Sequence, residues 1–484
     1  MSILRLPNEL LLHIASFLLF DWDIASLLRA NRRLKDLLEV PLLQNNLSEH
    51  GGSALPVFAK NGRRSGVQTF LKLGASGYEV DFNFRTAWSY AAENGDFETW
   101  QMLLDHMLSL GRELDLNISD ERTPLSWAAE GGQLEFAQYL VQLGADVNSK
   151  SMEKRTALSY AAQSGHFTIV RWLLDQGANT QDSTQSSDID GLTPLHYAAF
   201  GGHEDIMGFL ISIGAGVDQS GLDSMDIGAQ TPLMEAARGG QYAAAKMLLE
   251  MGANANEEDE TGMSPLQYAA RAGVGEPLRQ SDYFTTSRSD QPGPGWYFDG
   301  TGYQAPHKSG GFRDYLAIVK LLVAHGADPN KAHDDYWREA QGGPLYCAAW
   351  SGATEIVQFL IDVGADVNEM RFTLNTTALH AAARNGHLDV VGKLLVNGAN
   401  VNARDLVGHT PLDRAKFAAK LVDEDGLRTV GIITKLDLIN AGTEIRIAWL
   451  ANNCDRTTLT LGFFILKNPG PVELKAGIGM TIEE

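Results

Sequence analysis

A short motif, threonine followed by proline or alanine, returns along most of this chain at a nearly constant interval. Neighbouring copies mostly lie 33 to 38 residues apart, and a period of that length indicates that each copy is one small unit of secondary structure. A unit of this size cannot bury its apolar face alone, so neighbouring units must stack on one another. The complete copies begin at Thr86, Thr123, Thr156, Thr193, Thr231, Thr377 and Thr410, and degenerate copies begin at Ser53, Ser264 and Gly343.

The copy that starts at Thr193 shows how each unit is expected to fold. Thr193 caps a helix, and Pro194 fits its first turn, where the missing N–H costs no hydrogen bond. Gly201-Gly202 ends this helix, and a second helix follows with apolar residues at helical spacing. Gly214 ends the second helix, because glycine readily adopts a positive φ. The pattern therefore predicts a helix–turn–helix unit that is repeated along the chain.

The segment Leu192-Thr193-Pro194-Leu195-His196-Tyr197-Ala198-Ala199 resembles the consensus of the ankyrin-repeat family. The resemblance covers residues 51–421, with about ten motif starts, and implies a mostly α solenoid. An insertion near 274–312 interrupts one unit, whose delayed second helix is expected from Tyr315 to His325. Five histidines stand where the family has histidine, and we expect them to hydrogen-bond between repeats rather than bind a metal: His166, His196, His203, His380 and His387.

The resemblance also implies where a partner binds, because ankyrin arrays present their turn tips and inner helices to other proteins. Several tips carry charged residues, and the formal charge of −21 favours a partner with a basic patch. The alternative is that the charged tips are merely solvated turns. The tip residues that we expect to contact a partner are Asp120, Glu121, Arg122, Glu153, Lys154, Glu258 and Asp259.

Residues 1–48 do not follow the repeat. An amphipathic helix begins at Leu6-Pro7, a second helix follows Asp23, and a third is expected from Arg32 to Val40. The string LPNELLLHIASFL…DIASLLRANRRLKDLL is similar to the F-box, a helical module that docks on the adaptor subunit of SCF-type ubiquitin ligases. The alternative is a helical cap over the first repeat, since solenoids need capping. The resemblance implies that adaptor contacts come from Leu6, Pro7, Leu10, Ile14 and Leu18.

The composition changes again in residues 425–484, where the order strand, turn, helix, strand is typical of an α/β nucleotide-binding fold. The segment GLRTVGIITKLDLINAGTE…LGFFILKNP is similar to part of a dynamin-type GTPase domain. This resemblance implies that Thr434, Lys435 and Asp437 are a vestigial guanine-binding motif. The phosphate-binding sequence G-x-x-x-x-G-K-S/T is absent, so GTP hydrolysis is not expected. The segment is either a degenerate fusion or the product of joining two neighbouring reading frames.

Composition narrows the remaining classes of function. A formal charge of −21 argues against nucleic-acid binding, because neutralising phosphates needs clustered lysine and arginine. With only two cysteines, neither a disulfide framework nor a thiolate zinc site is available. No signal sequence or transmembrane segment is evident, which favours the cytoplasm or the nucleus. We expect no cofactor, no metal, no membrane partner and no catalytic residue.

These observations predict a protein that acts through protein–protein interaction and is not an enzyme. The preferred hypothesis is a substrate-receptor subunit of an SCF-type ubiquitin ligase, which holds a target protein on its repeats while the F-box-like module docks on the adaptor. The alternative is an ankyrin scaffold protein with no link to a ligase. A third hypothesis is a GTP-binding dynamin-like protein, and the missing phosphate-binding sequence counts against it.

Overall fold

The structure is a computed structural model of the 484-residue chain. It describes residues 32–49, 51–81, 83–113, 115–117, 122–152, 154–180, 192–219, 230–259, 262–272, 315–331, 342–370 and 375–422. These residues are mostly helical, which confirms the predicted mostly α solenoid. Residues 1–31, the insertion near 274–312 and the predicted strands and helix of residues 425–484 lie outside the described residues.

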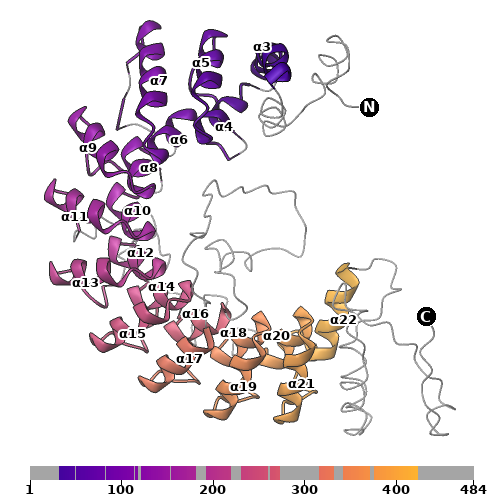
Figure 1. Ribbon diagram of the computed structural model, residues 1–484. Coiled ribbons are helices and arrows are strands. Elements are labelled where there is room, and N and C mark those ends of the chain that lie inside the picture. The colour runs from indigo at the N-terminus through magenta and orange to yellow at the C-terminus, as the bar shows by residue number, and fades with distance from the viewer. Residues whose placement is uncertain are drawn as a thin grey trace. The chain divides into compact units, whose positions relative to one another are not determined.

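The described residues fall into two compact units, the first ending at Ala253 and the second beginning at Asn254. Each unit is built mainly of helix pairs (Figure 1). The helices of the first unit are α3 (Arg32–Glu49), α4 (Ala54–Lys60), α5 (Arg64–Lys72), α6 (Ala87–Asn94), α7 (Phe97–Ser109), α8 (Pro124–Glu130), α9 (Leu134–Gln142), α10 (Ala157–Ser164), α11 (Phe167–Asp175), α12 (Pro194–Gly201), α13 (Glu204–Ser212), α14 (Pro232–Gly239) and α15 (Tyr242–Glu250). The helices of the second unit are α16 (Pro265–Arg271), α17 (Tyr315–Ala324), α18 (Pro344–Ser351), α19 (Thr354–Asp362), α20 (Ala378–Asn385), α21 (Leu388–Val396) and α22 (Pro411–Val422).

Within each unit the helix pairs stack in the order of the chain. The first helix of a pair packs against the first helix of the next pair, so that α4, α6, α8, α10, α12 and α14 form one row in the first unit. In the second unit α16, α18, α20 and α22 form the corresponding row. Each of these first helices from α4 to α20 also packs against its own second helix, so the second helices line one side of the row (Figure 1).

The predicted start and stop signals lie where the helices begin and end. The hydroxyl oxygen of Thr123 accepts a hydrogen bond of 3.2 Å from the Ser126 N–H, and Pro124 takes the first position of α8. Helix α10 ends at Gly165, whose φ of 81° lies in the left-handed region that favours glycine. The delayed second helix after the insertion is confirmed, because α17 begins at Tyr315.

Small residues allow the first helices to approach one another closely. In α10 both Ala161 and Ala162 are completely buried. A β-carbon added to Gly131 would lie only 2.0 Å from the carbonyl oxygen of Glu93 in the preceding repeat, so a larger residue would force the two repeats apart. This close spacing brings side chains of adjacent first helices within reach of one another.

Two helices are longer than the repeat pattern predicts. The expected end of the third helix at Val40 is wrong, because α3 continues through Pro41 to Glu49. Leu43, which follows this proline, is completely buried, so packing in the core outweighs the hydrogen bond that proline removes. Helix α7 has 13 residues where α9 has nine. This additional turn accounts for the interval of 37 residues between Thr86 and Thr123.

Candidate partner-binding surface

The first helices of the first unit carry alternating arginine and aromatic side chains. In three successive repeats an arginine directly precedes the capping threonine, and an aromatic residue stands four positions after that threonine. Each arginine lies over the ring of its own repeat and over the ring of the next, with 3.5 to 4.0 Å between the guanidinium carbon and the ring centre. We call this row the arginine–aromatic ladder; it consists of Tyr90, Arg85, Trp127, Arg122, Tyr160, Arg155 and Tyr197.

Each arginine of the ladder is also held at its edge by the residue eight positions later in its own repeat. The pairs are Arg85 with Glu93, Arg122 with Glu130 and Arg155 with Gln163. Stacking on both faces and a polar partner at the edge hold the guanidinium planes in place. The ladder therefore ties four repeats together, and its largely buried rings stiffen this part of the first-helix row.

The ladder ends at α14, where a different charged contact replaces it. The position four residues after the cap is Glu235 instead of an aromatic residue, and Glu235 pairs with Arg238. Both side chains are almost completely buried. Arg238 lies 4.7 Å from the ring centre of Phe200 on the preceding first helix, so stacking between repeats continues with a new pair of residues.

A second set of contacts joins the turns to the helices that follow them. In three repeats an aspartate five positions before the cap accepts a hydrogen bond from a side chain on the first helix, and we call these contacts the aspartate latches. Their side-chain donors are Tyr90 to Asp81 (2.8 Å), Tyr268 to Asp259 (2.6 Å) and Arg414 to Asp405 (2.6 Å). Each aspartate also accepts hydrogen bonds from backbone N–H groups of its own turn.

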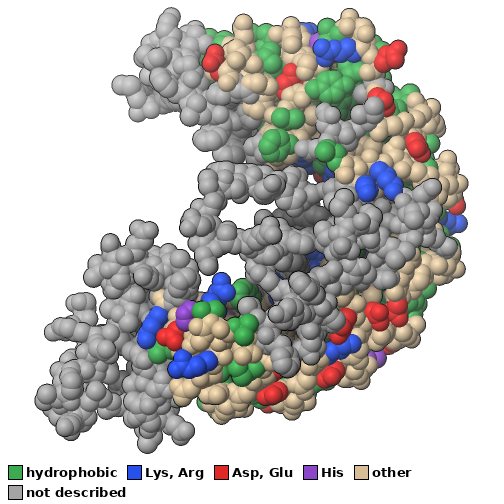
Figure 2. All heavy atoms as spheres, turned by 180° about the vertical axis from the view of Figure 1, so that it is seen from behind, with side chains coloured by type: hydrophobic (Ala, Val, Ile, Leu, Met, Phe, Trp, Pro, Cys, Tyr) green, Lys and Arg blue, Asp and Glu red, His purple; other side chains and the backbone are tan. Residues whose placement is uncertain are grey.

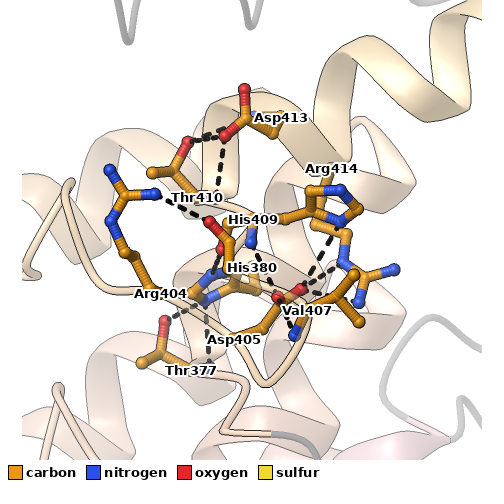
Figure 3. Close-up of polar contacts among 10 residues, drawn as sticks. Thr377, His380, Arg404, Asp405, Val407, His409, Thr410, Asp413 and Arg414 are labelled. Carbon is orange, nitrogen blue, oxygen red and sulfur yellow. Dashed lines mark hydrogen bonds and ion pairs between the residues drawn. The ribbon is translucent and has the colours of Figure 1, made fainter.

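The last latch is drawn in Figure 3. Asp405 accepts hydrogen bonds from the N–H groups of Val407 (3.0 Å) and His409 (2.8 Å) in addition to the one from Arg414. Burial alone would raise the pKa of Asp405, but the hydrogen bonds from His409 and Arg414 outweigh burial and hold the pKa below its usual range. Asp405 is therefore a buried, ionised anchor of its turn.

The predicted hydrogen bonds of the histidines between repeats are confirmed. Nδ1 of His196 accepts from the Thr193 N–H (3.1 Å), and Nε2 donates to the carbonyl oxygen of Gln230 in the next repeat (2.8 Å). Burial lowers the pKa of His196 to about 4, so this ring is neutral. His380 makes the same two contacts, and the other three histidines bond to a carbonyl oxygen of the preceding repeat: His166 to Glu130, His203 to Gln163 and His387 to Trp350.

The predicted turn-tip residues fall into different environments. Lys154 is exposed, and Glu258 lies 3.2 Å from Lys331 at a partly buried ion pair. Arg122 belongs to the ladder and Asp259 to a latch, where both oxygens of Asp259 accept hydrogen bonds inside the protein. The latch makes Asp259 part of the turn's own structure, because its carboxylate is almost completely buried.

The other predicted site residues lie outside the described residues. They are Asp120, Glu121 and Glu153 at the tips, Leu6, Pro7, Leu10, Ile14 and Leu18 of the F-box-like string, and Thr434, Lys435 and Asp437 of the tail. Of the tip residues in the described part, Arg122 and Lys154 belong to the first unit, and Glu258 and Asp259 belong to the second.

Sequence reasoning missed the ladder and the latches. A signal for the ladder is present, because an arginine before the cap and an aromatic residue after it recur together in three successive copies. A signal for the latches is the aspartate five positions before the cap at Asp81, Asp259 and Asp405. Both signals appear only when the copies are aligned on their capping residues.

The described part of the chain has neither a membrane-spanning helix nor a metal-binding cluster. No helix there combines the length and the apolar character needed to cross a membrane. Nor does any group of three histidine, cysteine, aspartate or glutamate residues in those ranges have the arrangement to hold a metal ion.

Comparison with protein families gives two matches that cover most of the array. A model described as three copies of the ankyrin repeat matches residues 55–151, 149–221, 219–278 and 345–420. A second model, described as many copies of the ankyrin repeat, matches residues 312–361. Together these matches run from the first repeat to α22 and leave residues 1–54, 279–311 and 421–484 unmatched.

Several curated proteins are similar to parts of the array. Alpha-latroinsectotoxin-Lt1a of Latrodectus tredecimguttatus is 44% identical over 110 residues, which are 22% of this chain and 7% of the toxin. The ankyrin repeat protein FPV031 of Fowlpox virus is 33% identical over 134 residues, 28% of this chain and 36% of its own. Ankyrin repeat and SOCS box protein 11 of Danio rerio is 38% identical over 101 residues, 21% of this chain and 32% of its own. The matches thus span at most 36% of these relatives. The family models cover more than half of the chain, and they place it in the ankyrin-repeat family, whose repeats bind other proteins.

Proposed function

We propose that this protein is a substrate-receptor subunit of an SCF-type ubiquitin ligase. The F-box-like string that begins at Leu6-Pro7 carries the proposal, because this kind of module docks on the ligase adaptor. The ankyrin repeats supply a surface for the target protein. The relative from Danio rerio offers a parallel, since its name joins ankyrin repeats to a SOCS box.

In this proposal residues 1–48 are the adaptor-binding module and residues 51–421 are the target-binding array. Residues 425–484, with their vestigial guanine-binding motif, take no part. The array holds the target close to the ligase, and the covalent transfer of ubiquitin is carried out by other subunits. The arginine–aromatic ladder favours this role, because repeats that are already held rigid lose little conformational entropy when a partner binds.

The adaptor contact can be tested by pull-down of the full chain with a purified SCF adaptor subunit. The double variant Leu10→Asp and Ile14→Asp places two charges on the apolar face that the F-box resemblance assigns to the adaptor. We expect the unaltered chain to bind and the double variant to lose binding, with the helical circular-dichroism signal of the array unchanged.

A matched control uses two exposed leucines at the end of α7. Leu108→Asp and Leu110→Asp make the same chemical change on the array, and adaptor binding is expected to remain. Failure of the unaltered chain to bind the adaptor would refute the ligase proposal and leave an ankyrin scaffold protein with a helical cap. Equal loss of binding in both double variants would show that the effect is not specific to the F-box-like string.

A further inference from the structure

The first-helix row of the second unit differs in charge from the rest of that unit. Among the residues of α16, α18, α20 and α22 whose side chains the structure describes, the charged residues are Arg271, Arg384, Arg414 and Lys416 against Asp413. The described turns before α16, α18 and α20 have the opposite excess, with Glu257, Glu258, Asp259, Asp328, Asp366 and Glu369 against Lys331. A chain whose formal charge is −21 therefore concentrates cationic side chains on one helical row.

Aromatic side chains lie beside these cations. Tyr346 and Trp350, one turn apart on α18, stack with 6.3 Å between their ring centres and an angle of 28° between their planes. The guanidinium carbon of Arg384 on α20 lies 5.5 Å from the ring centre of Trp350. Both aromatic residues are half-buried and Arg384 is exposed, so a partner can contact the cation and the rings together.

The arginine of the last repeat is held in place on the same row. Arg414 donates to Asp405, and its side chain remains 21% exposed. The single carboxylate of α22, on Asp413, accepts hydrogen bonds from the N–H (3.0 Å) and the hydroxyl (2.8 Å) of Thr410, so it is engaged at the helix cap. Seen from behind, Lys, Arg and His side chains gather where α20 and α22 form the surface, at the lower left of Figure 2.

We infer that this basic–aromatic face, defined by Tyr346, Trp350, Arg384 and Arg414, binds an acidic segment of the partner protein. Charge complementarity selects the occupant, since carboxylates match the guanidinium groups and apolar side chains match the two rings. The formal charge of −21 favours a partner with a basic patch, whereas this face favours an acidic segment of the partner. The local charges decide here, because the charges nearest to a bound segment set its orientation and its specificity. The inference rests on the proposed binding role of the array, but it does not depend on the link to a ligase.

The arginines of the first unit differ from Arg384 in their ion pairs. The ladder arginines Arg85 and Arg122 are paired with glutamates of their own repeats, so their charges are neutralised before a partner arrives. In the described part of the chain no carboxylate forms an ion pair with Arg384, whose contact there is with Trp350. A partner's carboxylate can therefore supply the counter-charge at Arg384 without displacing an internal ion pair.

The test measures binding of a fluorescein-labelled peptide of Glu-Glu-Tyr repeats to the full chain by fluorescence anisotropy at low salt. The same peptide with glutamine in place of glutamate is the uncharged probe. Arg384→Glu reverses the charge on the basic–aromatic face, and Lys393→Glu makes the same change at an exposed site on the second helix α21. We expect Arg384→Glu to weaken binding of the glutamate peptide by about tenfold, and Lys393→Glu to have less than about a twofold effect.

The glutamine peptide is expected to bind far more weakly than the glutamate peptide. Failure of the glutamate peptide to bind, or equal losses in Arg384→Glu and Lys393→Glu, would overturn the inference. A single-stranded oligonucleotide that binds as tightly as the peptide would assign the face to nucleic acid instead. A dimer in sedimentation that Arg384→Glu dissociates would assign it to a second copy of this chain. Adaptor pull-down is independent of these outcomes, so the ligase proposal can stand or fall separately.

Discussion

The guanidinium carbon of Arg122 lies 3.6 Å from the ring centre of Tyr160, a residue of the next repeat. The same guanidinium lies 3.5 Å from Trp127 of its own repeat, so the arginine is enclosed between two aromatic rings. Its ion pair with Glu130 fixes the remaining edge. Because a solenoid is stabilised by contacts between neighbouring repeats, a side chain in this position contributes to the coupling of two repeats.

We therefore expect Arg122→Ala to destabilise the array. Loss of two cation–π contacts and of the ion pair should lower the free energy of unfolding by about 1–2 kcal/mol. Urea denaturation followed by circular dichroism measures the change. Arg171→Ala, at an exposed position on α11, is the matched control and should change stability by less than about 0.5 kcal/mol. Equal effects of the two substitutions would contradict a role for stacking in the ladder.

The pKa of His196 predicts how stability depends on pH. In the folded protein it is about 4, below the value of about 6.5 for an unfolded histidine. Between these values the unfolded chain takes up a proton that the folded chain does not, so stability is complete above pH 6.5 and falls as the pH is lowered towards 4. The loss from this residue should reach about 3 kcal/mol near pH 4, measured as the urea midpoint at a series of pH values.

The chain itself provides the control for this histidine. Gln267 occupies the equivalent position in a later repeat, where its side-chain oxygen accepts from the Ser264 N–H (2.8 Å) and its amide nitrogen donates to the Gly342 carbonyl oxygen (3.1 Å). His196→Gln should keep both hydrogen bonds and remove the part of the pH dependence that comes from His196. Burial also lowers the pKa of His203 and His380, so a smaller slope remains. An unchanged slope in His196→Gln would show that His196 is not the source.

Features with a local cause could be predicted from the sequence. Thr123 and Pro124 begin a helix wherever the rest of the chain lies, since a cap and a first-turn proline act on backbone groups nearby. The histidine contacts could be predicted because the family pattern places them. The ladder could not, because the ring above Arg122 belongs to Tyr160, 38 residues later, and this pairing depends on how closely successive repeats stack.

The burial of Asp259 and the length of α3 depend on packing that could not be predicted from the sequence. Asp259 stands in an acidic sequence that is typical of an exposed turn. Its carboxylate is nevertheless buried, where it accepts a hydrogen bond from the Tyr268 hydroxyl. Pro41 is a usual signal for the end of a helix, but burial of Leu43 keeps α3 intact beyond it. In both cases the outcome depends on a side chain whose position is set by the fold. Residue type alone therefore predicted the wrong environment for Asp259 and the wrong end for α3.

Lys154 adopts a backbone conformation that is unfavourable for lysine, with a φ of 57°. Gly262 and Gly408 occupy the same position of other repeats, two residues before the cap. Lys154→Gly should relieve this strain and raise the free energy of unfolding by about 0.5–1 kcal/mol in urea denaturation. Lys154→Ala removes the same side chain but keeps the strain, so it should not stabilise the protein. A gain of similar size in both variants would exclude backbone strain as the cause.

The latch between Asp405 and Arg414 joins the last turn to α22. Arg414→Ala removes a donor from a buried carboxylate and should destabilise the last repeat by about 1–3 kcal/mol. Amide hydrogen exchange should therefore become faster in α22 while α10 is unaffected. Arg414→Tyr recreates the donor that Tyr90 provides to Asp81, so it should restore slow exchange.

The same pair of variants separates folding of the last repeat from partner binding. Arg414→Tyr keeps the latch but removes a cation from the basic–aromatic face, so exchange in α22 should stay slow while the glutamate peptide binds more weakly. Arg414→Lys keeps the charge but changes the geometry of the latch, because a lysine cannot reproduce the planar fork of arginine. In this variant exchange in α22 should become faster while the glutamate peptide still binds. If exchange and peptide binding change in parallel in both variants, the arginine acts on the partner only through the stability of its helix.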